Sequence, residues 1–235
     1  MRPQLKTAIL TAHGQPSAPA PQEAALARTA ADVAALLPGW DIRSATLASP
    51  GRLEEVMQEG AVIYPFFMAR GWFTAKVLPD RLRGRSYRMA EPFGLSAGLP
   101  LLVARAVKAA AEERHWDLAA TRLLLAAHGS ARGPKAAEAA ESFGSRLAPL
   151  LPGCALSLGY VEQAPTIEAA ARPLPAQSLC LPFFAQAGDH VKDDIPEALE
   201  AAAFEGAVMP VTGALPGVPA LIAAALRAAA ASVPE

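Results

Sequence analysis

Short apolar runs alternate with longer amphipathic segments along the whole chain. In the second half, the apolar runs predict strands near 122–127, 154–161, 177–184 and 206–210. The amphipathic segments there predict helices near 134–150, 165–173, 191–203 and 217–232. Continuous apolar strands between helical segments are typical of a parallel sheet that is buried on both faces. The pattern therefore predicts an α/β fold in which helices cover a mainly parallel sheet.

The first half of the chain repeats this order. The segment AILTAHGQ at 8–15 matches LLLAAHGS at 123–130, and Pro-Phe-Phe occurs at both 65–67 and 182–184. Each half also ends with prolines, a glycine and an Ala-rich helical segment. We therefore expect two tandem, similar three-layer domains, 1–117 and 118–235, each with a four-stranded, mainly parallel sheet flanked by helices.

Three residues that often carry chemistry follow the predicted strands of the second half. His128 comes directly after the first strand, Glu162 ends the second, and His190 lies just beyond the third. Glycines flank both histidines and allow a ligand to approach closely. Because the carboxyl ends of parallel strands share one edge, where ligands bind, we expect these three side chains to meet there.

Two imidazoles and a carboxylate suit a borderline divalent ion such as cobalt, nickel, ferrous iron or zinc, and they also suit proton transfer. Of these three residues, the first half keeps only the counterpart of His128, which is His13. Phe73 occupies the position of His190. Alignment of Pro50 with Pro165 places Leu47 opposite Glu162. The first half is therefore expected to be a degenerate copy, in which His13 is either a packing residue or a third donor.

Composition narrows the class of protein. The 235 residues are 52% hydrophobic and 18% charged, with a formal net charge of −1, which predicts a folded protein without general attraction for nucleic acid or an anionic membrane. No apolar run is long enough for a signal peptide or a membrane span, so we expect a cytoplasmic location. Cys154 and Cys180 lie in apolar surroundings and are expected to be buried thiols.

The two halves differ in local charge. Residues 70–88 carry six basic residues against Asp80 alone, a net charge of +5, whereas 189–205 carry six acidic residues against Lys192, a net charge of −5. Either run suits an ordinary solvated surface. The basic run also suits a wall that faces a polyanionic ligand, since arginine binds carboxylates with two hydrogen bonds.

The segments LLLAAHGSARGP, GYVEQAPTIEAA and LPFFAQAGDHVKDDIPEAL resemble the CbiX-type sirohydrochlorin chelatases, which have the class II chelatase fold. The resemblance covers about 121–222 strongly and 7–103 in degenerate form. It implies ATP-independent insertion of a divalent metal ion (cobalt, ferrous iron or nickel) into sirohydrochlorin or a related tetrapyrrole, without an organic cofactor. It also implies that His128 and His190 bind the metal and that Glu162 is their acidic partner.

Other residues are expected to contact the tetrapyrrole: His13, Arg70, Lys76, Ser130 and Gly188. The expected partner is this substrate alone, with no nucleic acid and no membrane, in a monomer or homodimer. The alternative function is a non-catalytic tetrapyrrole or metal carrier. A phosphohistidine enzyme is disfavoured because Ala127 supplies no cationic support beside His128, and a serine hydrolase because Ser130 lacks the G-x-S-x-G elbow.

Overall fold

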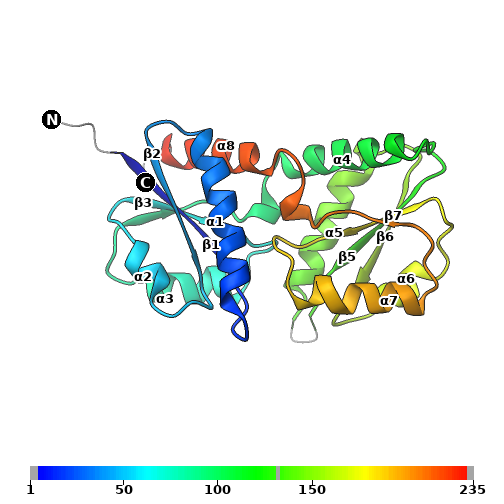
Figure 1. Cartoon of the computed structure of the whole chain (residues 1–235), viewed down its shortest axis with the longest axis horizontal. Coiled ribbons are helices and arrows are strands. Elements are labelled where there is room, and N and C mark those ends of the chain that lie inside the picture. Colours follow the sequence, from blue (N-terminus) through cyan, green and yellow to red (C-terminus); the bar gives the residue numbers. More distant parts are fainter. Residues whose placement is uncertain (1–4, 131–132, 232–235) are drawn as a thin grey trace. The chain divides into compact units, whose positions relative to one another are not determined.

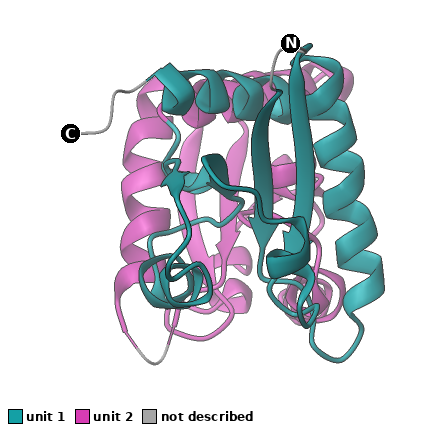
Figure 2. Cartoon of the chain, turned by 90° about the vertical axis from the view of Figure 1, so that its left-hand side faces the viewer, with its two compact units in different colours: residues 1–96, 217–235 teal, residues 97–216 magenta. Residues whose placement is uncertain are grey.

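The structure, a computed structural model, describes residues 5–130 and 133–231 (Figure 1). The chain forms two compact units. The first consists of residues 1–96 and 217–235, and the second of residues 97–216 (Figure 2). Each unit has one sheet with helices on its faces.

The sheet of the first unit has four strands in the order β2-β1-β3-β4, and every neighbouring pair is parallel. Its strands are β1 (Lys6–Ala12), β2 (Trp40–Thr46), β3 (Ala61–Pro65) and β4 (Tyr87–Met89). The central strands β1 and β3 are almost entirely buried, as their continuous apolar sequences require.

The sheet of the second unit repeats this topology in the order β6-β5-β7-β8, again with parallel pairs throughout. Its strands are β5 (Arg122–Ala127), β6 (Ala155–Tyr160), β7 (Ser178–Pro182) and β8 (Ala207–Val208). The α/β class, with two four-stranded parallel sheets flanked by helices, is thereby confirmed.

The helices follow the strands in the expected order. Those that follow β1 to β4 are α1 (Pro19–Ala35), α2 (Arg52–Val56), α3 (Leu78–Arg81) and α4 (Leu99–Glu113). Those that follow β5 to β8 are α5 (Lys135–Leu147), α6 (Ile167–Ala171), α7 (Ile195–Ala201) and α8 (Val218–Ala231). A π-helical turn leads into α3 at Phe73–Val77, and another leads into α7 at His190–Asp194. Among the described residues, no helix is long and apolar enough to cross a membrane.

The two units exchange their last helices. Helix α4 follows the first sheet but belongs to the second unit, whereas α8 follows the second sheet and belongs to the first unit (Figure 2). Within the first unit α8 lies beside α1, and Arg227 donates a hydrogen bond of 2.7 Å to the carbonyl of Leu36. Within the second unit α4 packs against α5.

The compact units therefore divide the chain differently from the expected domains 1–117 and 118–235. Helices α4 and α8 are both Ala-rich, and each buries an apolar stripe of the same kind. The pattern specifies that each helix must cover a sheet, but it does not specify which of two similar sheets.

Both cysteines are free and buried. Burial raises the pKa of the Cys180 thiol to about 12, and burial also raises the pKa of Cys154, although Arg122 acts in the opposite direction. Because the thiolate is the reactive species, we expect neither cysteine to react with Ellman's reagent at pH 8 in the folded protein, and both to react in guanidinium. Rapid release of one equivalent of thionitrobenzoate from the native protein would contradict this expectation.

Candidate metal-handling site

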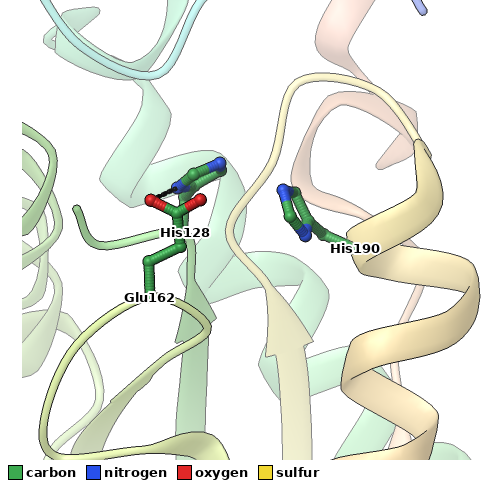
Figure 3. Close-up of side chains that lie close together, drawn as sticks. All are labelled: His128, Glu162 and His190. Carbon is green, nitrogen blue, oxygen red and sulfur yellow. Dashed lines mark ion pairs between the residues drawn. The ribbon is translucent and has the colours of Figure 1, made fainter. Parts of the chain in front are cut away.

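Three side chains meet at the carboxyl edge of the second sheet, on loops that are far apart in sequence. His128 follows β5, Glu162 follows β6, and His190 begins the π-helical turn before α7 (Figure 3). One potential ligand atom from each lies within 4.8 Å of the other two. Among the described residues, this is the one group of three or more His, Cys, Asp or Glu side chains close enough to share an ion.

Backbone hydrogen bonds fix the position of Glu162 beside His128. The amide of Val161 donates to the carbonyl of Ala127, and the amide of Glu162 donates to the carbonyl of His128, each over 3.0 Å. These bonds continue the β5–β6 ladder past the ends of both strands. As a result the Glu162 carboxylate lies 3.7 Å from Nδ1 of His128.

Gly129 turns the chain away immediately after His128. Its φ is +66°, and a Cβ atom at this position would lie 2.7 Å from Cγ of Gln163 and 2.9 Å from Cβ of Tyr160. Only glycine fits this turn without strain. The same loop is held by a hydrogen bond of 2.8 Å from the amide of Ser130 to Oε1 of Gln163.

The hydrogen bonds of His128 define which ring nitrogen is available. Its Nδ1 lies 2.9 Å from the carbonyl oxygen of Gly129, which only accepts hydrogen bonds. Nδ1 must therefore carry the proton and donate it, and Nε2 keeps a free lone pair for a metal ion.

His190 is oriented in the same way by a carboxylate. Its Nδ1 lies 2.5 Å from Oδ2 of Asp194, four residues further along the same π-helical turn. A carboxylate accepts the Nδ1 proton, so Nε2 of His190 is also left for an ion. The ring centroids of His128 and His190 are 4.6 Å apart, at an interplanar angle of 84°.

Asp194 is a functional residue that its place in an acidic run of the sequence does not distinguish from its neighbours. The available signal was its spacing, since a residue four positions after a histidine lies on the same side of a helical turn.

The side chains of His128, Glu162 and His190 are 42%, 41% and 37% exposed, so an ion from solvent reaches them without opening of the fold.

The carboxyl edge of the first sheet shares part of the geometry found around His128 in the second sheet. His13 follows β1, and its Nδ1 lies 2.7 Å from the carbonyl of Gly14, as in the His128–Gly129 pair. The amides of Leu47 and Ala48 donate to the carbonyls of Ala12 and His13. The counterpart of Glu162 is therefore Ala48, and the sequence alignment with Leu47 was wrong.

This error arose from the loops that follow β2 and β6. Pro165 follows Glu162 by three positions, whereas Pro50 follows Ala48 by two. Alignment on the prolines therefore shifted the match by one residue. The match of Phe73 with His190 agrees with the structure, because both begin a five-residue π-helical turn. The Phe73 ring lies edge-on to His13, with centroids 4.3 Å apart.

The basic stretch 70–88 is largely paired within its own unit. Arg70 pairs with Glu91 at 2.5 Å and Lys76 with Asp80 at 2.6 Å. The guanidinium of Arg81 forms two hydrogen bonds with the carboxylate of Glu54, which lowers the pKa of Glu54 and raises that of Arg81. The net charge of +5 counted along the sequence therefore overstates the positive charge of this surface. Arg70 and Lys76 remain 69% and 61% exposed.

Gly188 and Ser130, the other expected substrate contacts, have clear backbone roles. The carbonyl of Gly188 accepts hydrogen bonds of 3.1 Å from the amides of Val191 and Lys192, and thereby starts the turn that carries His190. Ser130 lies in the half-buried loop after His128.

Comparisons with known proteins place these features in context. The CbiX family profile matches residues 122–232. The chain is similar to the solved structure of CbiX, described as the terminal enzyme for biosynthesis of siroheme in denitrifying bacteria. The identity is 46% and the TM-score 0.87, over 95% of this chain and 99% of that chain. No curated protein sequence matches significantly.

Two more distant structures support the fold alone. SirB from Bacillus subtilis with Fe³⁺ matches with 15% identity and a TM-score of 0.73, over 97% of this chain and 96% of that chain. DR2241 from Deinococcus radiodurans, a multi-domain protein with structural similarity to chelatases, matches with 20% identity and a TM-score of 0.69. That match covers 95% of this chain and 54% of that chain.

Proposed function

Since this chain belongs to the CbiX family, we propose that it is a sirohydrochlorin chelatase, which inserts a divalent metal ion into sirohydrochlorin or a related tetrapyrrole without ATP. One observation carries the proposal within this chain. His128, Glu162 and His190 offer ligand atoms within 4.8 Å of one another, and their half-exposed side chains are open to an incoming ion. An open site of this kind suits an ion that must be passed on.

The proposed reaction exchanges one divalent ion for two pyrrole protons. Nε2 of His128 and Nε2 of His190 replace water molecules of the incoming ion and hold it, since their Nδ1 atoms are engaged elsewhere. The carboxylate of Glu162 supports the ion or accepts a proton as the ring releases it. Cobalt, ferrous iron and nickel accept nearly the same ligands, so the proposal includes all three as substrates. No organic cofactor has a role in it.

A metal or tetrapyrrole carrier is the second candidate. The exposure of all three side chains favours it, because an ion bound there stays accessible for transfer. We place either activity in the cytoplasm and in a monomer or homodimer, with the tetrapyrrole as the one partner.

Turnover separates the two candidates. The purified protein is incubated anaerobically with excess sirohydrochlorin and Co²⁺, Fe²⁺ or Ni²⁺, and the absorption spectrum of the tetrapyrrole is followed. A chelatase converts many equivalents of sirohydrochlorin per protein at a rate above that of the metal alone. A carrier gives at most one equivalent, and that result would rule out the proposed enzyme.

Asp194 is proposed as a positioning residue for His190. Asp194→Ala removes the acceptor for Nδ1, and we expect Co²⁺ to bind about 10- to 100-fold more weakly, as is typical when the partner of a metal-binding histidine is lost. Asp194→Asn keeps an oxygen acceptor and should restore most of the affinity. Titration of the protein with Co²⁺, followed by its visible absorption, measures both effects.

Asp193→Ala is the matched control, because it removes the same charge from a neighbouring exposed position. If Asp193→Ala weakens Co²⁺ binding as much as Asp194→Ala does, the effect comes from charge alone and the positioning role is excluded.

A further inference from the structure

In the first unit, apolar residues occupy the positions that match four acidic or metal-binding residues of the second unit, and His13 alone matches one of the two site histidines. The two π-helical turns correspond residue by residue, so Phe73 occupies the position of His190 and Val77 that of Asp194. The residue before each turn changes from Asp189 to Trp72. In the adjacent loop Ala48 stands for Glu162. All four replacements are apolar, and two of them are aromatic.

The two aromatic replacements, Trp72 and Phe73, form one contiguous cluster with His13 and Phe67, and we call these four residues the aromatic platform. The Phe73 ring lies edge-on to His13 at 4.3 Å, and Phe67 stacks on Phe73 at 6.1 Å. Trp72 lies edge-on to Phe73 at 5.3 Å.

Trp72 and His13 are the exposed members of the aromatic platform, and Phe67 and Phe73 are half-buried. Trp72 is 67% exposed, the largest value among the exposed large hydrophobic residues in the described part of the chain. The indole rests on Phe73 and extends the aromatic rings to the surface. A contiguous exposed apolar patch bordered by polar residues is typical of a ligand-binding surface.

Cations flank the aromatic platform. Arg70 lies two residues before Trp72, and Lys76 lies within the same π-helical turn as Phe73. Both side chains are more than half exposed, and their ion pairs with Glu91 and Asp80 are surface pairs of the kind that contribute little free energy. They are therefore available to exchange their carboxylate partners for those of a ligand.

We propose that the aromatic platform binds the face of the tetrapyrrole macrocycle, with Arg70 and Lys76 contacting carboxylates at its rim. A flat conjugated ring bordered by carboxylates matches an exposed indole bordered by cations in both shape and charge. In this proposal the edge of the first sheet binds the tetrapyrrole ring, and the equivalent edge of the second sheet binds the metal ion. This inference rests on the proposed function for the identity of the ligand.

The test is the affinity of the whole chain for metal-free sirohydrochlorin, titrated anaerobically and followed by absorption. Trp72→Ala is expected to weaken binding about tenfold, the scale of losing one aromatic stacking partner. Trp72→Phe keeps a ring and should stay within about threefold of the original affinity. Trp116→Ala is the control and should leave the affinity for sirohydrochlorin unchanged. Trp116 precedes β5, whereas His128 follows it, so the two residues lie at opposite ends of this strand.

Binding of Co²⁺ without tetrapyrrole supplies an independent readout. Trp72→Ala should not alter it, because the proposed metal ligands lie in the second unit. The inference is overturned if Trp72→Ala binds sirohydrochlorin normally, or if it loses Co²⁺ affinity to the same extent. It is also overturned if the variant changes only the oligomeric state, which would mark the platform as a protein contact.

The two proposals fail separately. If sirohydrochlorin binding depends on Trp72 but the unaltered protein gives no turnover with any of the three metals, the chelatase proposal fails and the platform stands. If turnover is normal and sirohydrochlorin binding does not depend on Trp72, the platform fails and the chelatase proposal stands.

Discussion

Replacement of His190 by alanine is expected to lower the rate of metal insertion at least about 100-fold while the protein remains folded. The variant removes one of two imidazoles that hold the ion, and loss of a group that acts directly on the reaction costs this much or more. The side chain is 37% exposed, so its removal opens no buried cavity and loses one partly exposed hydrogen bond to Asp194, and the free energy of unfolding should change by less than about 1 kcal/mol. Sirohydrochlorin turnover and denaturant unfolding measure the two effects.

Two variants serve as references for this result. His190→Phe installs the residue that the first unit carries at Phe73, and it should be as inactive as the alanine variant. His115→Ala removes an exposed histidine beyond the end of α4 and should keep full turnover. Undiminished insertion by either His190 variant would remove His190 from the mechanism.

Gly129→Ala is expected to destabilise the protein and to weaken the metal site together. A non-glycine residue in a left-handed conformation costs about 1–3 kcal/mol, and the added Cβ would lie 2.7 Å from Cγ of Gln163. The added Cβ would also lie 2.9 Å from Cβ of Tyr160, which cannot rotate away, so the backbone of Gly129, whose carbonyl orients the His128 ring, must shift. We therefore expect a lower denaturant midpoint and a Co²⁺ affinity reduced about 10-fold or more.

Gly14→Ala is the matched control that the duplicated chain supplies. Gly14 has a φ of +76°, and its added Cβ would lie 2.7 Å from Cβ of Thr46, so the local strain is similar. The first unit carries no metal cluster among its described residues. Both variants should therefore lower stability, and Gly129→Ala alone should lower Co²⁺ affinity. Equal losses of Co²⁺ affinity would show that general destabilisation, and not the position of His128, is responsible.

The elements nearest to the site could be predicted because their sequence signals are local. The run Leu123–Leu125 is fully buried in β5, as a continuous apolar strand requires, and Gly129 and Gly188 mark turns that the structure also has. Since parallel strands end at one edge, the positions of His128, Glu162 and His190 after three strands were sufficient to bring them together.

Long-range features could not be predicted in the same way. The exchange of α4 and α8 depends on which sheet each helix covers, and their similar apolar stripes carry no such information. The pairing of Arg81 with Glu54 joins residues from different elements, so a count of charge along one segment missed it. Ala48 was missed because the adjoining loops differ by one residue.

The most direct measurement is the position of a bound ion. A crystal of the protein soaked with Co²⁺ is measured at the cobalt absorption edge, and the anomalous difference map locates the metal. We expect one strong peak in the second unit, at roughly 2.1 Å from Nε2 of both His128 and His190, the usual length for an imidazole ligand. A peak bound to other residues, or one that touches only a single histidine and persists in His190→Ala, would contradict a shared site.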